Sequence, residues 1–323
     1  MDDEGLMRAG LLVNPSSGRG SGKGLALAET LAGDPCVMVR VIEDFARLPE
    51  HLREFAGAGV SDIFISSGDG TVQAIQTELV EAAAFPALPR LSLLPHGTTN
   101  MTAADLGFRH RQVQAQADFI RGGEARDLRQ RHTLRAVNPR DGRPRHGMFL
   151  GTGAVAEATL FCQRAFNDKG VKGSWATFAT LAAAVGKSLF TRPDPHDLTR
   201  FDRPFPITVE AAGAAPVTGD HLFFLATTLD KLILGTRPFW GGKSEAIRST
   251  VIPYPVPSIL RWLVPMMYGG ENRRSPKGAV SFSARAISVR SPVIFVIDGE
   301  FFEPPEHEPL RIEAGPLFTY IRG

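Results

Sequence analysis

The stretch Asp62-Ile63-Phe64-Ile65-Ser66-Ser67-Gly68-Asp69-Gly70-Thr71 decides the fold. An apolar run typical of a buried strand ends in a glycine turn, and a helical pattern follows from Thr71 to Ala84. The same order returns at Leu91-Ser92-Leu93-Leu94, which runs into Pro95-His96-Gly97-Thr98-Thr99-Asn100. A strand that enters a helix through a Gly-Thr loop brings backbone N–H groups and the positive helix end together, where a phosphate binds. Both turns therefore indicate a nucleotide.

The first 125 residues alternate apolar strands with helical patterns. Strands are predicted over 11–13, 36–42, 62–65 and 91–94, and helices near 24–31, 49–58, 71–84, 100–106 and 112–120. This alternation predicts an α/β nucleotide-binding domain over 1–125, with a parallel sheet covered by helices. Such sheets bind ligands at the carboxyl ends of their strands, where the glycine-rich turns lie.

The rest of the chain, residues 126–323, changes character. Strand-like segments at 128–137, 148–150, 207–211, 222–228, 286–289 and 293–297 are separated by Pro- and Gly-rich turns. Asn138-Pro139-Arg140-Asp141-Gly142 is typical of a hairpin turn between two strands. We expect a second, β-rich domain that is antiparallel and sandwich-like, a cleft between the domains, and a strand near 317–321 that returns to the first. The Pro-rich stretch 191–206 is predicted to be an irregular loop.

Composition narrows the function classes. The 323 residues include 36 Lys and Arg against 34 Asp and Glu, so bulk charge gives no support to nucleic-acid binding. The two cysteines, Cys36 and Cys162, have no metal-ligand spacing, and we expect both to be small core residues in a reducing compartment. An acidic N-terminus and the lack of an apolar run of about 18 residues predict a protein made and kept in the cytoplasm.

Three further patterns carry candidate chemistry. The loop Val13 to Gly24 follows the first strand and supplies small residues that let a phosphate approach the backbone, although its spacing differs from a Walker motif. Asp69, between two glycines, can reach a metal-bound phosphate or a substrate hydroxyl, or it is simply an Asp in a tight turn. Ile297-Asp298-Gly299-Glu300 ends an apolar strand and is either a general-base site or an acidic hairpin turn.

Together these motifs resemble the diacylglycerol kinase catalytic family, which also includes sphingosine and ceramide kinases. The family pattern N-P-x-S/A-G, G-G-D-G-T, P-x-G-T-x-N-D and D-G-E is matched in order, over nearly the whole chain. The matching segments are Asn14-Pro15-Ser16-Ser17-Gly18, Ser67-Gly68-Asp69-Gly70-Thr71, Pro95-His96-Gly97-Thr98-Thr99-Asn100-Met101 and Asp298-Gly299-Glu300.

The resemblance implies an ATP- and Mg²⁺-dependent lipid kinase with a diacylglycerol-type acceptor. Asp69 and Glu300 would be catalytic, and Asp69 would also support Mg²⁺ through the nucleotide. The implied ATP-binding residues are Asn14, Pro15, Ser17, Ser67, Gly68, Gly70, Thr71, Val72, Gln73, Gly97, Thr98 and Asn100. A lone histidine in a turn, His96, is left out of this set because it is more often a solvated or hydrogen-bonded bystander.

Departures from the family pattern keep other acceptors open. Ser67 is similar to the residue of sphingosine kinases, and Met101 replaces the Asp that commonly follows the Asn. Ile42 replaces a nucleotide-contacting Thr, and Phe239 to Ser244 lies where bacterial relatives hold a structural Mg²⁺. The alternatives are a ceramide or sphingoid-base kinase, a soluble kinase similar to NAD kinases, and a non-catalytic lipid-binding protein.

A lipid acceptor implies an apolar pocket and peripheral contact with a membrane surface, at its inner face. Residues 175–190 form a largely apolar pattern, which favours a core helix at the wall of a lipid pocket. Residues 254–268 combine Trp, Tyr and Met with Arg261, ahead of Arg273 and Arg274. This composition suits either a headgroup interface or burial.

Overall fold

The computed structural model describes residues 9–19, 22–122, 126–167, 186, 200 and 203–323. Within 161–167 it describes the side chain of Gln163 alone, so the expectation for Cys162 lies outside the described side chains. The patterns at 175–190 and most of 191–206 also lie outside the described residues. The chain divides into two compact units, of which the first comprises 1–133, 229–235 and 315–323 and the second 134–228 and 236–314.

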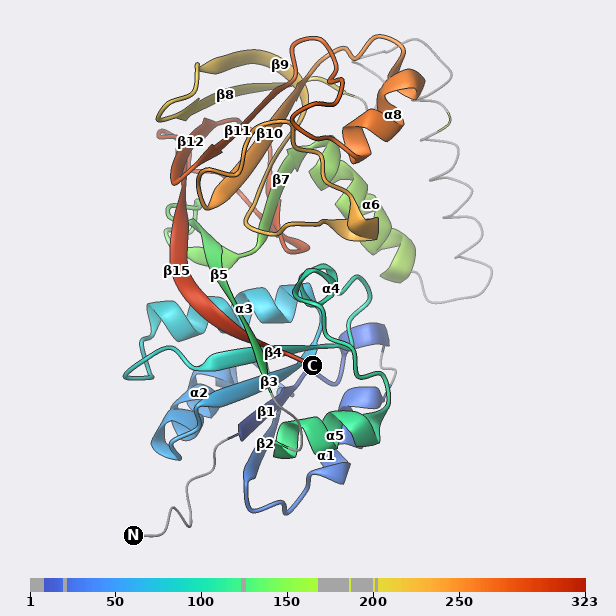
Figure 1. The fold of residues 1–323 in the computed structure, drawn as a ribbon. Helices are drawn as coiled ribbons and strands as arrows, with labels where there is room; N and C mark the ends of the chain where they lie inside the picture. Colours follow the sequence, from blue (N-terminus) through green and yellow to red (C-terminus); the bar gives the residue numbers. More distant parts are fainter. Residues whose placement is uncertain (1–8, 20–21, 123–125, 168–185, 187–199, 201–202) are drawn as a thin grey trace. The chain divides into compact units, whose positions relative to one another are not determined.

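The first unit is built on a parallel sheet, as the alternating pattern predicts. Its strand order is β15-β4-β3-β1-β2, and each neighbouring pair runs parallel. The elements are β1 (Ala9–Val13), α1 (Lys23–Thr30), β2 (Val37–Val41), α2 (Leu48–Gly57), β3 (Asp62–Ser67), α3 (Asp69–Glu81), β4 (Arg90–Pro95), α4 (Met101–Leu106) and α5 (Val113–Arg121). Short 3₁₀ turns cover Ser17–Arg19, Phe45–Arg47 and Ile233–Gly235. Figure 1 shows this unit in blue to green around the labels β1 to β4.

Alternate residues of β1 face the two helical layers. Leu11 and Val13 pack in one core cluster with Leu27 of α1 and Ile120 of α5. Gly10 points to the other face, where an added Cβ would lie 2.6 Å from the ring of Phe55 in α2. The sheet is therefore covered on both sides, which explains why its strands are apolar without alternation.

The segment 229–235 belongs to the first unit although it follows a strand of the second. The amide of Lys231 donates to the Asp105 Oδ1 atom at 2.9 Å. Arg131 donates to Asp105 at 3.1 Å and to Asp230 at 2.8 Å, and Arg129 donates to Asp230 at 2.5 Å. These charge-assisted bonds hold the segment against α4 and β5.

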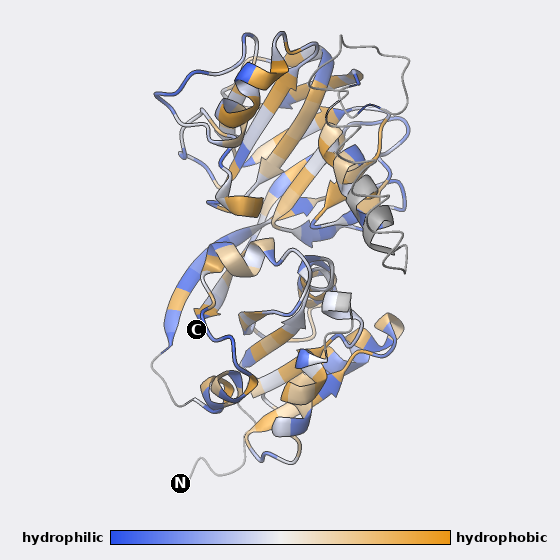
Figure 2. Cartoon of the chain, turned by 90° about the vertical axis from the view of Figure 1, so that its right-hand side faces the viewer, coloured by the Kyte–Doolittle hydropathy of each residue, from blue (hydrophilic) through white to orange (hydrophobic). Residues whose placement is uncertain are grey.

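The second unit is antiparallel, in agreement with the predicted β-rich domain. Its order is β14-β13-β7-β9-β8-β12-β15, and β10 pairs with both β9 and β11. The elements are β5 (Asp127–Ala136), β6 (Arg145–Gly147), β7 (Phe149–Gly153), α6 (Ala154–Asn167), β8 (Phe205–Ala211), β9 (Val217–Thr227), β10 (Ile247–Pro253), α8 (Ile259–Met267), β11 (Val280–Ala284), β12 (Ala286–Arg290), β13 (Phe295–Ile297), β14 (Glu300–Phe302) and β15 (Leu310–Arg322). The first residues of β5 and the last of β15 lie in the first unit. Figure 2 shows hydrophobic residues along the strands of both units and hydrophilic ones on the loops.

Local signals explain several of these elements, and one expectation is wrong. The turn at Asn138 to Gly142 joins β5 to β6, which pair antiparallel, so the predicted hairpin is confirmed. β15 pairs in parallel with β4 at Tyr320 and Leu91. Cys36 is exposed rather than in the core, because it lies in the turn that enters β2, where its amide donates to Asp34.

Candidate functional site

The two glycine loops of the first unit meet backbone to backbone. Gly68 lies between β3 and α3, and Gly97 lies between β4 and α4. A Cβ added at Gly97 would lie 2.2 Å from the Gly68 Cα atom and 2.9 Å from its backbone nitrogen. A Cβ at Gly68 would lie 3.3 Å from the Gly97 Cα atom. A side chain at Gly97 does not fit between the loops and one at Gly68 would be tight, so glycine at both positions lets them form one surface.

Asn100 closes the second loop. The amide of Gly97 donates to the Asn100 Oδ1 atom at 2.7 Å, and the Asn100 Nδ2 atom donates back to the Gly97 carbonyl at 2.7 Å. Asn100 has a φ of 50°, a left-handed conformation that asparagine tolerates better than most residues. Thr98 and Thr99 are exposed at the tip of the loop. The loop is thus shaped by its own side chain, and its two threonines face solvent.

Asp69 binds the start of α4. Its Oδ2 atom accepts from the Met101 amide at 2.9 Å, and its Oδ1 atom accepts from the Thr102 amide at 3.0 Å. Both partners are backbone amides of α4, which the second glycine loop brings to the carboxylate. A carboxylate offers about four lone-pair sites, so acceptor capacity remains on Asp69. Asp69 therefore joins the two loops and still presents a negative charge at their junction.

Helices α1 and α3 begin without a side-chain cap, in contrast to α4. Gly22 precedes α1 and Gly68 precedes α3, and neither helix has a capping side-chain hydrogen bond at its N-terminus. The first backbone N–H groups of a helix have no partner within the helix. Both helix ends follow loops at the carboxyl ends of β1 and β3. They can donate to phosphate oxygens, which the helix dipole also favours.

Asn14 connects the first loop to α3. Its Nδ2 atom donates to the Thr71 Oγ1 atom at 2.8 Å, and its Oδ1 atom accepts from the Ser16 amide at 2.9 Å. A small pocket opens beside it at the ends of β1, β3 and β4. The lining residues are Asn14, Pro15, Ser17, Gly22, Gly24, Leu25, Ser66 and His96. The predicted first loop and both glycine turns are thus brought to the same edge of the sheet.

His96 lines this pocket, and the sequence reasoning left it out. The side chain is 6% exposed, and its Nδ1 atom lies 2.8 Å from the Ser66 hydroxyl. Burial lowers the pKa of His96 to about 4, and the positive charge of Lys23 lowers it further, against a weak contact with Gln116. The imidazole is therefore neutral at pH 7. One feature of the sequence indicated that His96 belongs to the site. It directly precedes Gly97, and a residue inside a glycine loop lies in the same surroundings as the rest of that loop.

Other predicted nucleotide-binding residues have internal contacts. Val72 and Gln73 are buried in α3, and the Gln73 Nε2 atom donates to the Thr77 hydroxyl at 3.0 Å. The Ser67 hydroxyl donates to the Gly68 carbonyl at 2.9 Å. The side chains of Val72 and Gln73 therefore pack inside the first unit.

The C-terminal acidic pair forms a hairpin turn in the second unit. Asp298 and Gly299 connect β13 to β14 with φ values of 47° and 97°, which suit a tight two-residue turn. The buried Asp298 carboxylate accepts from the amides of Met148 at 2.8 Å and Phe149 at 3.0 Å. Glu300 is exposed at the start of β14. Asp298 thus holds β7, and Glu300 is the member of the pair that a substrate can reach.

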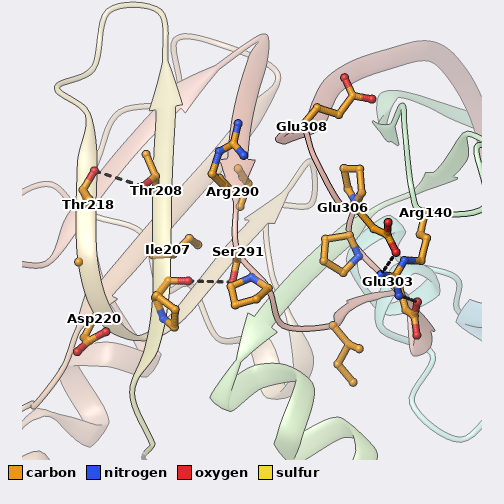
Figure 3. Close-up of a pocket in the computed structure, with 17 residues that line it drawn as sticks. Arg140, Ile207, Thr208, Thr218, Asp220, Arg290, Ser291, Glu303, Glu306 and Glu308 are labelled. Carbon is orange, nitrogen blue, oxygen red and sulfur yellow. Dashed lines mark hydrogen bonds and ion pairs between the residues drawn. The ribbon is translucent and has the colours of Figure 1, made fainter.

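A larger pocket of 690 Å³ lies within the second unit, between β8, β9, β12 and residues 303–308 (Figure 3). Figure 3 shows Arg140 beside Glu303 and Glu306, with which it forms ion pairs. Thr218 and Thr208 bridge the strands on the opposite side. The predicted site residues do not line it. With Arg140 already paired with Glu303 and Glu306, and with none of the predicted site residues in its lining, this pocket offers no match to the predicted chemistry.

The part of the chain that the structure describes holds neither a cluster of metal ligands nor a membrane-spanning helix. No group of three or more His, Cys, Asp or Glu side chains there could hold a metal ion. The same residues contain no helix that is both long and apolar enough to cross a membrane.

Comparisons with known proteins add a family and a fold. Residues 8–130 match the family model described as the diacylglycerol kinase catalytic domain, which confirms the resemblance. A solved structure described as "a putative diacylglycerol kinase from Bacillus anthracis str. Sterne" has a TM-score of 0.64 at 17% identity, over 100% of this chain and 98% of the other. A diacylglycerol kinase from the same strain has a TM-score of 0.63 at 18% identity, over 98% and 97% of the two chains. At these identities the structures establish the fold. No curated protein matches this chain.

Proposed function

We propose that the protein is an ATP-dependent lipid kinase that phosphorylates a diacylglycerol-type hydroxyl, and the match of residues 8–130 to the diacylglycerol kinase catalytic domain supports this proposal. The observation that carries the proposal is the pair of glycine loops in backbone contact, beside the uncapped N-termini of α1 and α3. This arrangement offers backbone donors to several phosphate oxygens at once. A triphosphate chain is the ligand that uses all of them.

The nucleotide would lie along the three loops at the ends of β1, β3 and β4. Amides of Gly70 and Thr71 at the start of α3 would donate to phosphate oxygens, and the loop of Gly97 and Thr98 would cover them. Asn14 would hold the first loop in place through its bond to Thr71. His96, neutral at pH 7, would not add charge against bound Mg²⁺.

The donor set fits magnesium that arrives with the nucleotide. Mg²⁺ is commonly bound through one or two carboxylates and the substrate phosphates, with water in its remaining positions. Asp69 can supply such a carboxylate because the α4 amides use only part of its acceptor capacity. When bound, the ion would neutralise charge that develops on the transferred phosphoryl group.

In the proposed reaction the lipid hydroxyl oxygen forms a bond to the γ-phosphorus. The bond from that phosphorus to the β–γ bridging oxygen breaks, ADP leaves, and the hydroxyl proton passes to a carboxylate. Asp69 and Glu300 are the two carboxylates proposed for this chemistry. Most of the acceleration would come from positioning and electrostatics, because the transferred group needs no covalent intermediate on the protein.

A ceramide or sphingoid base is the second candidate acceptor. Ser67 favours it through the resemblance to sphingosine kinases, and the serine is accommodated because its hydroxyl bonds to the Gly68 carbonyl. Either lipid requires the enzyme to work at a membrane surface, so peripheral binding at the inner face of the membrane, from the cytoplasm, is part of the proposal.

Four possible acceptors, offered one at a time, test this proposal. Diacylglycerol, ceramide, sphingosine and NAD are offered separately with γ-labelled ATP and Mg²⁺ in mixed micelles. Labelled phosphatidic acid is the expected product, and Glu300→Gln should lower its rate while Glu303→Gln, also exposed but paired with Arg140, should not. Label on NAD alone would refute a lipid acceptor, and no labelled acceptor would favour a binding role.

A further inference from the structure

Helix α8 in the second unit has two apolar faces. Ile259, Trp262 and Met266 pack in a cluster with Leu222 and Ile252, and their spacing of three and four residues places them on one side of the helix. The burial of this face holds α8 against the strands β9 and β10. Figure 1 shows α8 in orange beside these strands.

The other face of α8 is exposed and also carries apolar side chains. Leu260 is 48% exposed, Leu263 38% and Val264 64%, and Tyr268 follows one turn later at 37%. Positions 260, 264 and 268 are four residues apart, so they form a stripe along the helix. An apolar stripe that the rest of the described chain does not bury marks an interaction surface.

Charge identifies the partner of this stripe. Residues 254–277 contain Arg261, Arg273, Arg274 and Lys277 but only one acid, Glu271. All four cations are exposed, and within the described residues none forms an ion pair with a carboxylate. Arg261 lies 5.9 Å from the centre of the Trp262 ring. Exposed aliphatic residues, a tyrosine, and arginines that have no carboxylate partner among the described residues fit the boundary between acyl chains and anionic headgroups.

The C-terminal end of α8 is fixed to its own unit. The Arg237 amide donates to the Met267 carbonyl at 2.7 Å, and the Gly269 amide donates to the Arg237 carbonyl at 2.9 Å. Arg273 donates to the Tyr268 carbonyl at 3.0 Å. The exposed stripe therefore belongs to a helix that is fixed by its buried face and by its C-terminal end. Membrane binding would not have to order this helix first.

We propose that the exposed face of α8 docks the protein on a bilayer that contains anionic lipid. This proposal rests on the proposed function, because docking would bring the enzyme to its lipid acceptor. The observations that support it and the experiments that test it do not depend on catalysis. Leu260, Leu263 and Val264 would enter the upper acyl region, while Arg273 and Arg274 would remain at the headgroups. A protein partner is less well supported, because the flanking cations outnumber the acids.

Co-sedimentation with vesicles tests the apolar stripe. The full chain is mixed with phosphatidylcholine vesicles that contain about a third phosphatidylglycerol, and the partition coefficient is measured. The double variant Leu260→Gln/Val264→Gln should lose at least ten-fold in binding. Leu128→Gln/Leu317→Gln is the matched control, because these leucines are 48% and 45% exposed in the first unit, and it should change binding less than two-fold. Equal binding of the α8 variant and the wild type would overturn the proposal, as would an equal loss in the control.

The arginines are tested by lipid composition. Arg273→Gln/Arg274→Gln should weaken binding to the anionic vesicles by about five-fold for each charge and leave binding to pure phosphatidylcholine unchanged. A dimer of the wild type in lipid-free solution that Leu260→Gln/Val264→Gln dissociates would assign the face to a second copy and overturn the proposal. So would an unchanged affinity of the arginine variant for anionic vesicles.

Activity on a short-chain, monomeric diacylglycerol separates this inference from the proposed function. The α8 variants should phosphorylate it at the wild-type rate, since they leave Asp69, Glu300 and the glycine loops unchanged. If the wild type binds anionic vesicles through α8 but phosphorylates no lipid, the proposed function fails and the docking surface stands. If it phosphorylates the short-chain lipid and the α8 variant binds vesicles normally, only the docking surface fails.

Discussion

Replacement of Gly97 by Ala tests whether the contact between the two glycine loops is essential. The added Cβ would lie 2.2 Å from the Gly68 Cα atom, well inside any contact that real Cβ atoms make, and 2.8 Å from the Asn100 Oδ1 atom. The nearest atom is backbone, so a side-chain rotation cannot relieve the clash. Overpacking of this kind costs about 1–3 kcal/mol. We expect a loss at the upper end, near 3 kcal/mol, together with separation of the loops.

Urea unfolding and titration with a fluorescent ATP analogue measure both consequences. Gly57→Ala is the control, because an added Cβ at the end of α2 has no atom within 4 Å, and it should raise the free energy of unfolding by about 0.5 kcal/mol. Gly97→Ala should weaken nucleotide binding at least ten-fold, whereas Gly57→Ala should not change it. A Gly97→Ala protein with the stability and nucleotide affinity of the wild type would show that the contact between the loops does not require glycine at position 97.

Four further substitutions probe the first unit. Asp69→Ala should abolish turnover and lower the free energy of unfolding by about 1 kcal/mol, since two α4 amides lose their acceptor; an unchanged urea midpoint would contradict the capping role. Asn14→Ala should lower the free energy of unfolding by about 1 kcal/mol. Adding Thr71→Val to this variant should lower it little further, because both substitutions remove the same hydrogen bond. Fully additive losses in the double-mutant cycle would argue against that bond. Burial lowers the pKa of His96 from 6.5 to about 4, so the unfolded chain binds the proton more tightly than the folded protein does. As the pH falls from 6.5 to 4, the free energy of unfolding should therefore fall by up to about 1 kcal/mol per pH unit. His96→Gln should flatten that slope, and identical slopes in the two proteins would count against the buried imidazole.

The elements of the first unit were predictable because their signals are local. The apolar run at 62–65 became β3, the helical pattern after Thr71 became α3, and each glycine turn fell at the carboxyl end of a strand. The parallel order follows from strand and helix alternation. The hairpin at Asn138 to Gly142 also needed only turn chemistry.

Long-range contacts were beyond the sequence pattern. Asp69 reaches the Met101 amide across 32 residues, and nothing near Asp69 in the sequence identifies that partner. Segment 229–235 joins the first unit through Asp105, which is 126 residues from Lys231. The prediction that Cys36 is buried in the core was also wrong. It relied on the usual burial of cysteine, whereas this residue lies in an exposed turn. The sequence of residues 254–268 allowed either a buried or an exposed segment. In the structure, α8 has one buried face and one exposed face.

The most direct measurement of the central claim is the stoichiometry of products from γ-labelled ATP and dioleoylglycerol in mixed micelles. A lipid kinase that uses Asp69 should give labelled phosphatidic acid and ADP in equal amounts, and Asp69→Asn should give neither. ADP and free phosphate without labelled lipid, or equal lipid labelling by the wild type and Asp69→Asn, would contradict it.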